Sequence, residues 1–369
     1  MKSILVVPLD WGLGHATRCI PIIRQLLEQN NMVFVGAEGK IAALISQEFP
    51  EITLLPLRGY RVRYTNRAAF FSMNLLMQMP KILRAIRYEK KWLDEIIHKY
   101  KIDAVISDNR YGLYTDKIPS VFITHQLHIQ SGWSLTDRLL QKINYRYINR
   151  FKSCWIPDHE GECNLAGKLS HPKKLPEIPV RYIGHLSRFS KRNMNALFKV
   201  AIILSGPEPQ RTIFEEKILN QMMDFKEPAI LLRGLPDNNE AVEHYHSKLL
   251  VHNHLSSDQL NTIINQSEYI IARSGYSTVM DLMSLKKKAI LIPTPGQTEQ
   301  EYIAEYLSNK QLVLSVSQEK FNLNEFIKKA DAFSYSNIQT GDNTKNIVNE
   351  WLDNIKTNEY TMPSSFEIR

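Results

Sequence analysis

Two series of short, continuous apolar runs constrain the fold of this chain more than any other feature of its sequence. In the first half the runs lie at 3–9, 32–37, 52–57, 103–108, 120–125 and 154–158. A second series lies at 199–204, 229–234, 249–255, 269–275 and 289–295. Helical patterns separate the runs within each series. Apolar runs of this kind are typical of parallel strands that helices cover on both faces, so the sequence predicts an α/β chain with two doubly wound domains.

The length of 369 residues also favours two domains, because single hydrophobic cores stop growing at roughly 250 to 300 residues. We expect the first domain to span 1–190 and the second 198–369, with a central cleft between them. The Pro-rich, basic segment 167–193 is interpreted as the approach to a linker. Near the C-terminus, a helical pattern predicts an amphipathic helix that packs back on the first domain, with its apolar side formed by Ile347, Trp351, Leu352 and Ile355.

Net charge, cysteine spacing and the N-terminal apolar run indicate which partners, metal sites and location to expect. The 46 Lys and Arg exceed the 38 Asp and Glu, and the resulting net charge of +8 favours anionic partners. Cys19, Cys154 and Cys163 form neither a C-x-x-C pair nor a zinc-ligand pattern, so we expect no disulfide and no metal site. The apolar run before Pro8 is too short for a signal peptide or a membrane span, which predicts a cytoplasmic protein.

A glycine-rich turn follows the first apolar run. In the stretch WGLGHATR, Gly12 and Gly14 permit a tight turn, and His15 lies at the start of the next helix. The free N–H groups of a helix N-terminus attract an anion, and a histidine there can act as a base. The alternative is a glycine turn with a surface histidine.

Other polar residues follow later strands of the first half. Asp108 ends the run ISD, on the sheet edge where His15 is expected, and an acid there can orient the imidazole of a general base. An N-cap aspartate is the alternative reading. His125 and His128 follow the next run and are expected to line the pocket rather than to bind metal.

The second half has loops suited to a diphosphate. Ser205 and Gly206 follow one run, and Arg273, Ser274 and Gly275 follow another, each before a helix. Two such turns would supply backbone N–H donors without a metal. Three further side chains offer carboxylate or amide groups for sugar or ribose hydroxyls: Asp281, Gln300 and Glu301.

These motifs together resemble the GT-B glycosyltransferases of the family 28 type, or MurG-like enzymes. The resemblance rests on GLGH, SGPEPQR, RSGYSTVMDL and PTPGQTEQEY and extends over nearly the whole chain. It implies two Rossmann-like domains facing a cleft, and a UDP-sugar as donor with no separate cofactor. It implies donor contacts at Ser205, Gly206, Arg273, Ser274, Gly275, Thr278, Asp281, Gln300 and Glu301. Asp281 stands where the family usually has a glutamate.

The first-half loop resembles two further groups. Small-molecule glycosyltransferases of this fold carry a G-H dipeptide with an aspartate partner, which implies catalytic roles for His15 and Asp108. The UDP-sugar hydrolase of pseudaminic acid synthesis has a similar G-x-G-H-x-x-R loop, matched by Gly12, Gly14, His15 and Arg18. The acceptor side is expected to include Gly12, Gly14, Arg18, Asn109, Arg110, His125 and His128.

The resulting hypothesis is an inverting, metal-independent transfer of a hexose or N-acetylhexosamine from a UDP-sugar to a carbohydrate or lipid-linked acceptor hydroxyl of the cell envelope. A UDP-sugar hydrolase and a non-catalytic nucleotide-sugar-binding protein remain the alternatives. Residues 58–91 contain nine Lys or Arg against one acidic residue, among Tyr, Phe and Met side chains. This composition suits peripheral contact with an anionic membrane at its inner face, and a core helix with a solvated basic face is the alternative. No nucleic-acid-binding module accompanies the charge, so nucleic acid is not expected as a partner.

Overall fold

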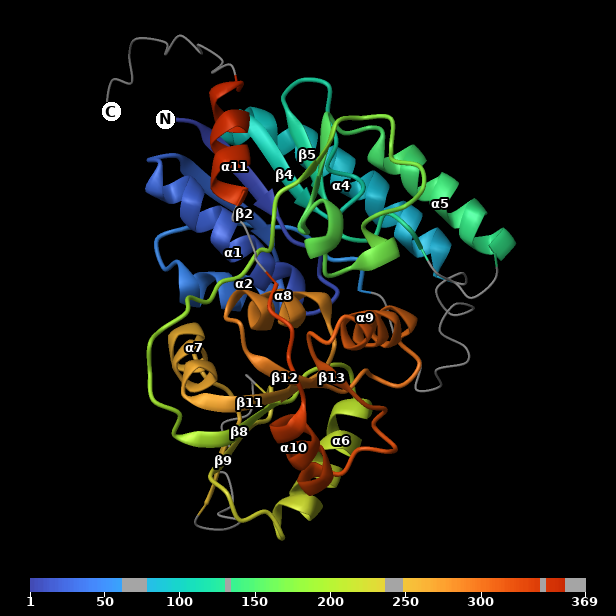
Figure 1. Cartoon of the computed structure of the whole chain (residues 1–369). Coiled ribbons are helices and arrows are strands. Elements are labelled where there is room, and N and C mark those ends of the chain that lie inside the picture. The colour runs from blue at the N-terminus through green and yellow to red at the C-terminus, as the bar shows by residue number, and fades with distance from the viewer. Residues whose placement is uncertain (62–77, 130–133, 236–247, 339–342, 356–369) are drawn as a thin grey trace.

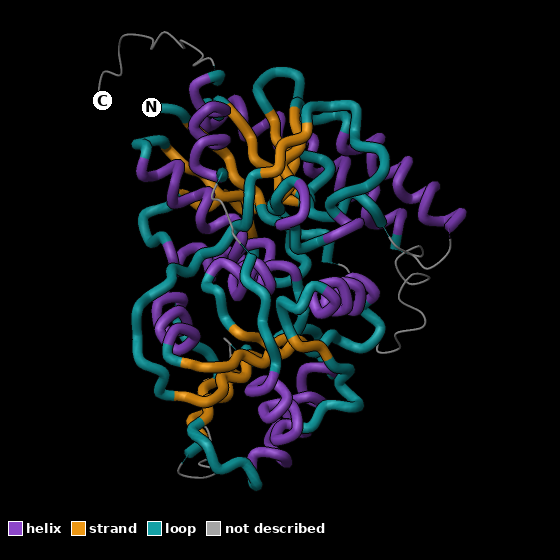
Figure 2. The backbone as a smooth tube through the Cα atoms, viewed as in Figure 1, coloured by secondary structure: helices purple, strands orange, loops and turns teal. Residues whose placement is uncertain are grey.

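The computed structural model describes residues 1–61, 78–129, 134–235, 248–338 and 343–355 (Figure 1). These residues form two separate parallel sheets, each surrounded by helices (Figure 2). Much of the segment 58–91, which we interpret as a membrane-facing surface, lies outside the described residues, because 62–77 are among those omitted.

The first sheet has the strand order β3-β2-β1-β4-β5-β6-β7, and every pair of neighbours is parallel. Its strands are β1 (Ser3–Val7), β2 (Met32–Ala37), β3 (Thr53–Pro56), β4 (Ala104–Asp108), β5 (Ser120–Ile123), β6 (Ser153–Ile156) and β7 (Val180–Tyr182). Its helices are α1 (Leu13–Glu28), α2 (Gly39–Glu48), α4 (Met79–Tyr100) and α5 (Ser134–Ile148), with the 3₁₀ turns η2 (Gly161–Cys163) and η3 (Gly167–Leu169).

The second sheet has the order β10-β9-β8-β11-β12-β13 and is parallel as well. Its strands are β8 (Phe198–Ile203), β9 (Ala229–Leu232), β10 (Leu249–His252), β11 (Ser267–Ala272), β12 (Lys288–Leu291) and β13 (Leu314–Ser315). Its helices are α6 (Gln210–Met222), α7 (Ser257–Asn265), α8 (Tyr276–Ser284), α9 (Thr298–Asn309) and α10 (Leu323–Ala332), and α11 (Thr344–Asp353) follows them in the chain. The prediction of two Rossmann-like, doubly wound units is confirmed by this topology.

The cores explain why the apolar runs are continuous. Ile4 and Val6 of β1 pack with α1 in one hydrophobic cluster, whereas Leu5 and Val7 pack with α4 in another. All four side chains are fully buried. Because both faces of this strand are covered, alternation with polar residues would place polar groups in a core.

Two strands were not predicted. β7 lies inside the segment 167–193, which we interpret as the approach to a linker, and it instead extends the first sheet beside β6. It has only three residues, none of them fully buried, and so lacks an apolar run. β13 is the two-residue edge of the second sheet.

The helix α11 leaves the second sheet and lies against the first (Figure 1). Gln25 of α1 donates to the carbonyl of Lys345 and to Oδ1 of Asn349, each at 2.9 Å. The ring of Trp351 meets that of Trp155 edge to face, with 5.3 Å between centroids. The chain therefore crosses between the two sheets twice, once in the linker before β8 and once before α11.

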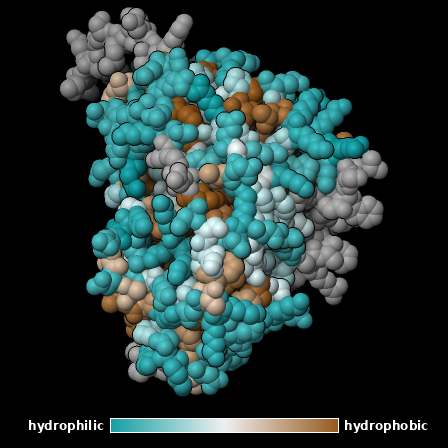
Figure 3. Space-filling view, viewed as in Figure 1, coloured by the Kyte–Doolittle hydropathy of each residue, from teal (hydrophilic) through white to brown (hydrophobic). Residues whose placement is uncertain are grey.

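The molecular face seen in Figure 3 is mostly hydrophilic, with small hydrophobic patches between polar residues. Within the described part of the chain, none of the helices is both long and apolar enough to cross a bilayer.

Candidate active site between the two sheets

The central strands of both sheets end in loops that carry predicted site residues. β1 lies between β2 and β4, and β8 lies between β9 and β11, so the strand order reverses at each of these positions. Open α/β sheets bind ligands at such switch points, outside the carboxyl ends of the strands. His15 follows β1 and Asp108 ends β4, while Ser205 follows β8 and Arg273 follows β11.

The turn before α1 needs glycine at its first position. Gly12 is the N-cap residue of α1, with a φ of 94°, in the region that L side chains rarely adopt. No side chain of the described residues caps α1 at this end. The helix therefore begins with free N–H groups beside His15.

His15 and Arg18 converge on one buried carboxylate. Nδ1 of His15 lies 3.0 Å from Oδ2 of Asp108, whose side chain is fully buried. Nε of Arg18 donates to the same oxygen at 2.9 Å, and its Nη2 donates to Oδ1. The structure thus brings together three residues predicted for this edge of the sheet.

The local charges favour a neutral imidazole beside an ionised carboxylate. Burial and the positive charge of Arg18 lower the pKa of His15, although Asp108 opposes this. Burial would raise the pKa of Asp108, but Arg18 and His15 outweigh it and bring this pKa to about 2. A neutral histidine held by an ionised aspartate is the state that a general base requires.

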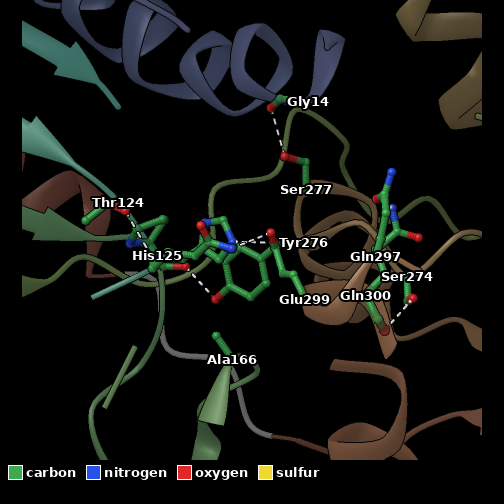
Figure 4. Close-up of polar contacts among 12 residues, drawn as sticks. Gly14, Thr124, His125, Ala166, Ser274, Tyr276, Ser277, Gln297, Glu299 and Gln300 are labelled. Carbon is green, nitrogen blue, oxygen red and sulfur yellow. Dashed lines mark hydrogen bonds and ion pairs between the residues drawn. The ribbon is translucent and has the colours of Figure 1, made fainter. Parts of the chain in front are cut away.

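The second half of the chain reaches this cluster through α9 (Figure 4). Nε2 of His125, at the end of β5, lies 2.7 Å from Oε1 of Glu299 in the first turn of α9. Gln126 donates to the other carboxylate oxygen of Glu299. Nη1 of Arg18 lies 3.1 Å from Nδ1 of His125. A continuous set of polar contacts therefore joins the first sheet to the second.

The N-terminal turn of α8 packs directly on the same loops (Figure 4). Tyr276 stacks on the ring of His125, with 4.3 Å between centroids, and donates to the carbonyl of Pro157 at 2.8 Å. Ser277 donates to the carbonyl of Gly14 at 2.8 Å. Added to Gly14, a Cβ would lie 3.0 Å from Oγ of Ser277, so glycine allows this close approach.

Arg273 lies behind the donor loops rather than on their surface. Its side chain is 1% exposed and donates to the carbonyls of Gln210, Ile292 and Pro293 and to Oε1 of Gln318. Burial lowers its pKa to about 10. The guanidinium therefore holds the loops after β8 and β12 together and places a positive charge beneath them, whereas Ser205 and Gly206 are exposed.

Three predicted donor contacts shape the loop before α9. Ser274 donates to the carbonyl of Gln300 at 2.8 Å. Oε1 of Gln300 accepts from the N–H of Thr294 at 3.0 Å, and Oε1 of Glu301 accepts from the N–H of Gly296 at 2.9 Å. These side chains fix the start of α9 against β11 and β12.

Asp281 and Thr278 lie on α8. Thr278 is partly exposed, whereas Asp281 is 8% exposed and accepts from Oγ of Ser187 at 2.7 Å. Burial raises the pKa of Asp281 to about 6, against the opposing charge of Arg188. A carboxylate buried at such a cost is a candidate for a functional role.

Of the predicted acceptor-side residues, Arg110 and His128 contact other parts of the first domain. Arg110 is 1% exposed and pairs with Glu89 of α4 at 2.7 Å, so its guanidinium lies inside the first domain. Asn109 adopts a left-handed conformation with a φ of 56° directly after β4. His128 faces Gln141 of α5, at 3.3 Å from Nδ1 to Oε1, outside the cluster around Asp108.

The sequence reasoning overlooked Glu299 and the docked face of α9. Side chains at three- and four-residue spacing along α9 contact the first domain: Glu299, Tyr302, Tyr306 and Lys310. Tyr302 accepts from the N–H of Lys168 at 2.8 Å, and Tyr306 donates to Asn164 at 2.7 Å. The i, i+3, i+7 spacing was a usable signal, because such residues share one face of a helix.

The second half of the chain is similar to a known protein domain family. Residues 224–355 match the glycosyltransferase family 28 C-terminal domain. The chain is 24% identical over 337 residues to a Buchnera aphidicola UDP-N-acetylglucosamine--N-acetylmuramyl-(pentapeptide) pyrophosphoryl-undecaprenol N-acetylglucosamine transferase, covering 89% of each chain. It is 23% identical to an uncharacterized glycosyltransferase of Methanosarcina acetivorans, covering 81% of each.

Solved structures share the whole architecture. The crystal structure of the kitacinnamycin glycosyltransferase superposes with a TM-score of 0.62 at 14% identity, covering 95% of this chain and 93% of that one. Acinetobacter baumannii MurG superposes with a TM-score of 0.53 at 13% identity, covering 96% and 100%. The chain therefore has the GT-B fold, is similar to MurG-type glycosyltransferases over most of its length, and matches the glycosyltransferase family 28 C-terminal domain over residues 224–355.

Proposed function

We propose that this protein transfers a hexose or N-acetylhexosamine from a UDP-sugar to a hydroxyl of a carbohydrate or lipid-linked acceptor, with inversion at the anomeric carbon. The observation that carries the proposal is the His15–Asp108 pair, which lies at the switch point of the first sheet and faces α8 and α9 of the second. The names of the MurG relatives support the choice of donor and of a lipid-linked acceptor.

In this mechanism His15 is the general base. Its Nδ1 faces Asp108, so its Nε2 takes the proton from the acceptor hydroxyl as that oxygen attacks the anomeric carbon. The bond from the anomeric carbon to the UDP oxygen breaks, and its electron pair leaves with UDP. Inversion follows because the base and the leaving group lie on opposite sides of the anomeric carbon.

Stabilisation of the departing UDP is assigned to the second domain. Among the described residues no side chain caps α8 at its N-terminus, whereas Glu208 accepts from the N–H of Thr212 in the first turn of α6 at 3.2 Å. The buried cation of Arg273 lies beneath the loops that lead into both helices. Preorganised N–H groups and a fixed positive charge favour developing negative charge on a diphosphate. The proposal gives this role to the protein itself rather than to a divalent cation.

One observation keeps a UDP-sugar hydrolase as a second candidate. Arg18, which completes the hydrolase-like G-x-G-H-x-x-R loop, binds Asp108 directly beside His15. In a hydrolase, His15 would deprotonate water instead of an acceptor hydroxyl, and the same contacts would serve that reaction.

Nucleotide release from UDP-, GDP-, dTDP- and CMP-sugars without acceptor, for the wild type beside His15→Ala, tests the proposal. We expect saturable binding of one UDP-sugar, slow release, and turnover when a polyprenyl-linked acceptor fraction is added. His15→Ala should lower that turnover about 10²- to 10⁴-fold, the usual contribution of a general base, while UDP affinity stays unchanged.

The alternatives predict different results in this assay. Rapid, stoichiometric and His15-dependent release without acceptor would make the protein a hydrolase. Tight UDP binding with no turnover for any donor and acceptor would favour a non-catalytic binding protein. Unchanged turnover in His15→Ala would remove His15 from the mechanism.

The proposal includes contact with an anionic membrane through α4 and α5. The outer face of α5 is amphipathic and exposes Arg138, Leu139, Lys142, Ile143 and Arg146. Arg84, Arg87 and Lys91 of α4 are exposed as well. Basic groups beside exposed apolar side chains suit a surface of anionic headgroups above acyl chains.

Co-sedimentation with phosphatidylglycerol vesicles tests this contact. Each basic residue near an anionic surface is worth about 1 kcal/mol, so Arg138→Glu/Lys142→Glu should weaken binding at least about tenfold. The matched control is Lys320→Glu/Lys328→Glu, the same charge change at exposed positions of the second domain. Equal binding by both double variants, or equal binding to phosphatidylcholine vesicles, would contradict the membrane contact.

A further inference from the structure

Thr294, in the loop between β12 and α9, has a buried hydroxyl group without a partner. The residue is 1% exposed, and its Oγ1 makes no hydrogen bond with any described residue. Its backbone groups are used, because its N–H donates to Oε1 of Gln300 and its carbonyl accepts from the N–H of Gln297, each at 3.0 Å. An unpaired buried hydroxyl costs stability, so its presence calls for an explanation.

This hydroxyl faces the predicted diphosphate loop after β8. Gly206 of that loop is exposed and has a φ of 104°, and a Cβ added to it would lie 3.6 Å from Oγ1 of Thr294. Among the described residues, no other atom outside the two chain neighbours of Gly206 lies within 4 Å of that position. The hydroxyl of Thr294 therefore borders the side of Gly206 on which a side chain is missing.

The loops after β8, β11 and β12 are held together around Thr294. Arg273 donates to the carbonyl of Gln210, at 2.9 Å, and to that of Pro293, at 3.3 Å. Ser274 donates to the carbonyl of Gln300, whose side chain accepts from the N–H of Thr294. Thr294 is thus fixed next to the residues that lead into α8.

The N-terminus of α6 is poorly suited to a diphosphate. Pro207 and Pro209 have no N–H, and Glu208 accepts from the N–H of Thr212 at 3.2 Å and from its hydroxyl at 2.8 Å. Burial would raise the pKa of Glu208, but its hydrogen bonds with Thr212 and Arg211 outweigh this and lower it. An ionised carboxylate therefore occupies the first turn of α6 and repels a second anion there.

The N-terminus of α8 is suited to an anion. Gly275 is its N-cap residue, and no side chain of the described residues caps the helix at this end. The N–H of Val279 bonds to the carbonyl of Gly275 at 3.0 Å, so the N–H groups of 276–278 have no partner within the helix. A Cβ added to Gly275 would meet none of the described atoms within 4 Å. Free N–H groups and the helix dipole favour negative charge at such a position.

We infer that Thr294 is a further donor-binding residue: its hydroxyl donates to the diphosphate of the nucleotide-sugar, which lies against the N-terminus of α8 rather than that of α6. Hydrogen bonds to a charged acceptor are short and strong, and this one pairs a hydroxyl that the free protein leaves unpaired. The inference rests on the proposed function for the identity of the donor.

Calorimetric binding of UDP and of uridine tests the inference without any acceptor. Thr294→Val removes the hydroxyl and nearly keeps the shape, so we expect about 10- to 100-fold weaker UDP binding, the size of effect of a hydrogen bond to a charged group. Uridine, which has no phosphate, should bind as it does to the wild type. Thr294→Ser keeps the hydroxyl and should retain most of the UDP affinity.

The matched control is Thr262→Val in α7 of the same domain. The hydroxyl of Thr262 already donates to the carbonyl of Asp258 at 3.0 Å, so this variant loses a hydrogen bond of the free protein and should bind UDP like the wild type.

Thermal unfolding without ligand provides a second readout. Because Thr294→Val removes an unpaired buried hydroxyl, it should raise the unfolding midpoint by about 2 to 4 °C, whereas Thr262→Val should lower it. Added UDP should raise the midpoint of the wild type more than that of Thr294→Val. A lowered midpoint for ligand-free Thr294→Val would show that the hydroxyl is paired within the protein, and this would overturn the inference.

The binding results also separate this inference from the proposed function. Equal UDP affinity in the wild type and Thr294→Val would overturn the inference alone, as would an equal loss of UDP and uridine binding. UDP binding that depends on the Thr294 hydroxyl, in a protein that transfers no sugar, would support the inference and contradict the proposed reaction. A wild type that binds no UDP would contradict both.

Discussion

Replacing Asp108 by asparagine is expected to lower turnover about 10³- to 10⁴-fold, the size of effect that loss of an orienting aspartate has on a histidine base. The amide keeps the shape of the carboxylate but not its charge. It cannot stabilise the imidazolium that forms when His15 takes a proton, and it leaves Arg18 buried without its carboxylate. Steady-state kinetics with the donor that the nucleotide-release assay selects measure the loss in turnover. Calorimetric UDP binding shows whether the second domain is intact.

The matched control for this substitution is Asp103→Asn. Asp103 precedes the other end of β4 and accepts from the N–H of Ser3 at 2.8 Å, a contact that an asparagine oxygen can keep. Its turnover should stay near that of the wild type. Equal losses in both variants would mean that β4 is perturbed and that Asp108 has no special role.

Asp108→Asn should also change how the stability of the protein depends on pH. The folded-state pKa of Asp108 is about 2, below its ordinary value of 3.8. Its carboxylate therefore contributes stability above pH 3.8, and this contribution is lost as pH falls toward 2. Acid unfolding of the wild type should show this loss, whereas Asp108→Asn should lack it.

The largest effect on stability is expected from Glu89→Ala. Glu89 is fully buried on α4 and accepts from Nε of Arg110 at 2.7 Å, from the hydroxyl of Tyr60 at 2.9 Å and from the N–H of Gly112 at 2.9 Å. Its removal leaves a buried guanidinium unpaired, which costs about 3 to 5 kcal/mol in the free energy of unfolding. Urea unfolding measures this difference.

Two further variants check the cause. Glu95→Ala removes an exposed carboxylate from the same helix and should change the free energy of unfolding by less than about 0.5 kcal/mol. In the double variant Glu89→Ala/Arg110→Ala no charge is left unpaired, so its cost should be smaller than the sum of the two single costs. A cost below about 1 kcal/mol for Glu89→Ala would contradict the assignment.

Burial raises the pKa of Glu89 even though the charge of Arg110 opposes it. The Glu89–Arg110 pair is therefore costly to bury. The other contacts of Arg110 suggest which segments the pair positions. Arg110 donates to the carbonyl of Arg58 at 2.7 Å and to that of Pro8 at 3.4 Å, immediately before the turn that presents His15. Glu89→Ala should consequently also lower turnover.

The fold was predictable because its determinants are local. Strands covered on both faces need continuous apolar runs, and the sequence shows these runs for both central strands, β1 and β8. The short strands β7 and β13 escaped because edge strands of two or three residues bury too little to leave such a pattern.

The meeting of His15 and Asp108 followed from the same topology, since neighbouring parallel strands end at one edge of a sheet. The surroundings of Arg110 did not follow from it. Asn109 takes a left-handed conformation just after β4, and the side chain that comes next pairs with α4 instead. The contact of Glu299 with His125 depends on how two separate sheets are oriented, which no local pattern encodes.

The return of α11 to the first sheet has a consequence for the order in which the protein can fold during synthesis. All strands of the second sheet lie within one continuous stretch, 198–315, whereas the first sheet is covered in part by 344–353. Thr344 donates to the carbonyl of Ile183, and Trp351 packs on Trp155. During synthesis on the ribosome, this surface of the first domain therefore stays uncovered until the second domain has emerged and α11 can pack on it.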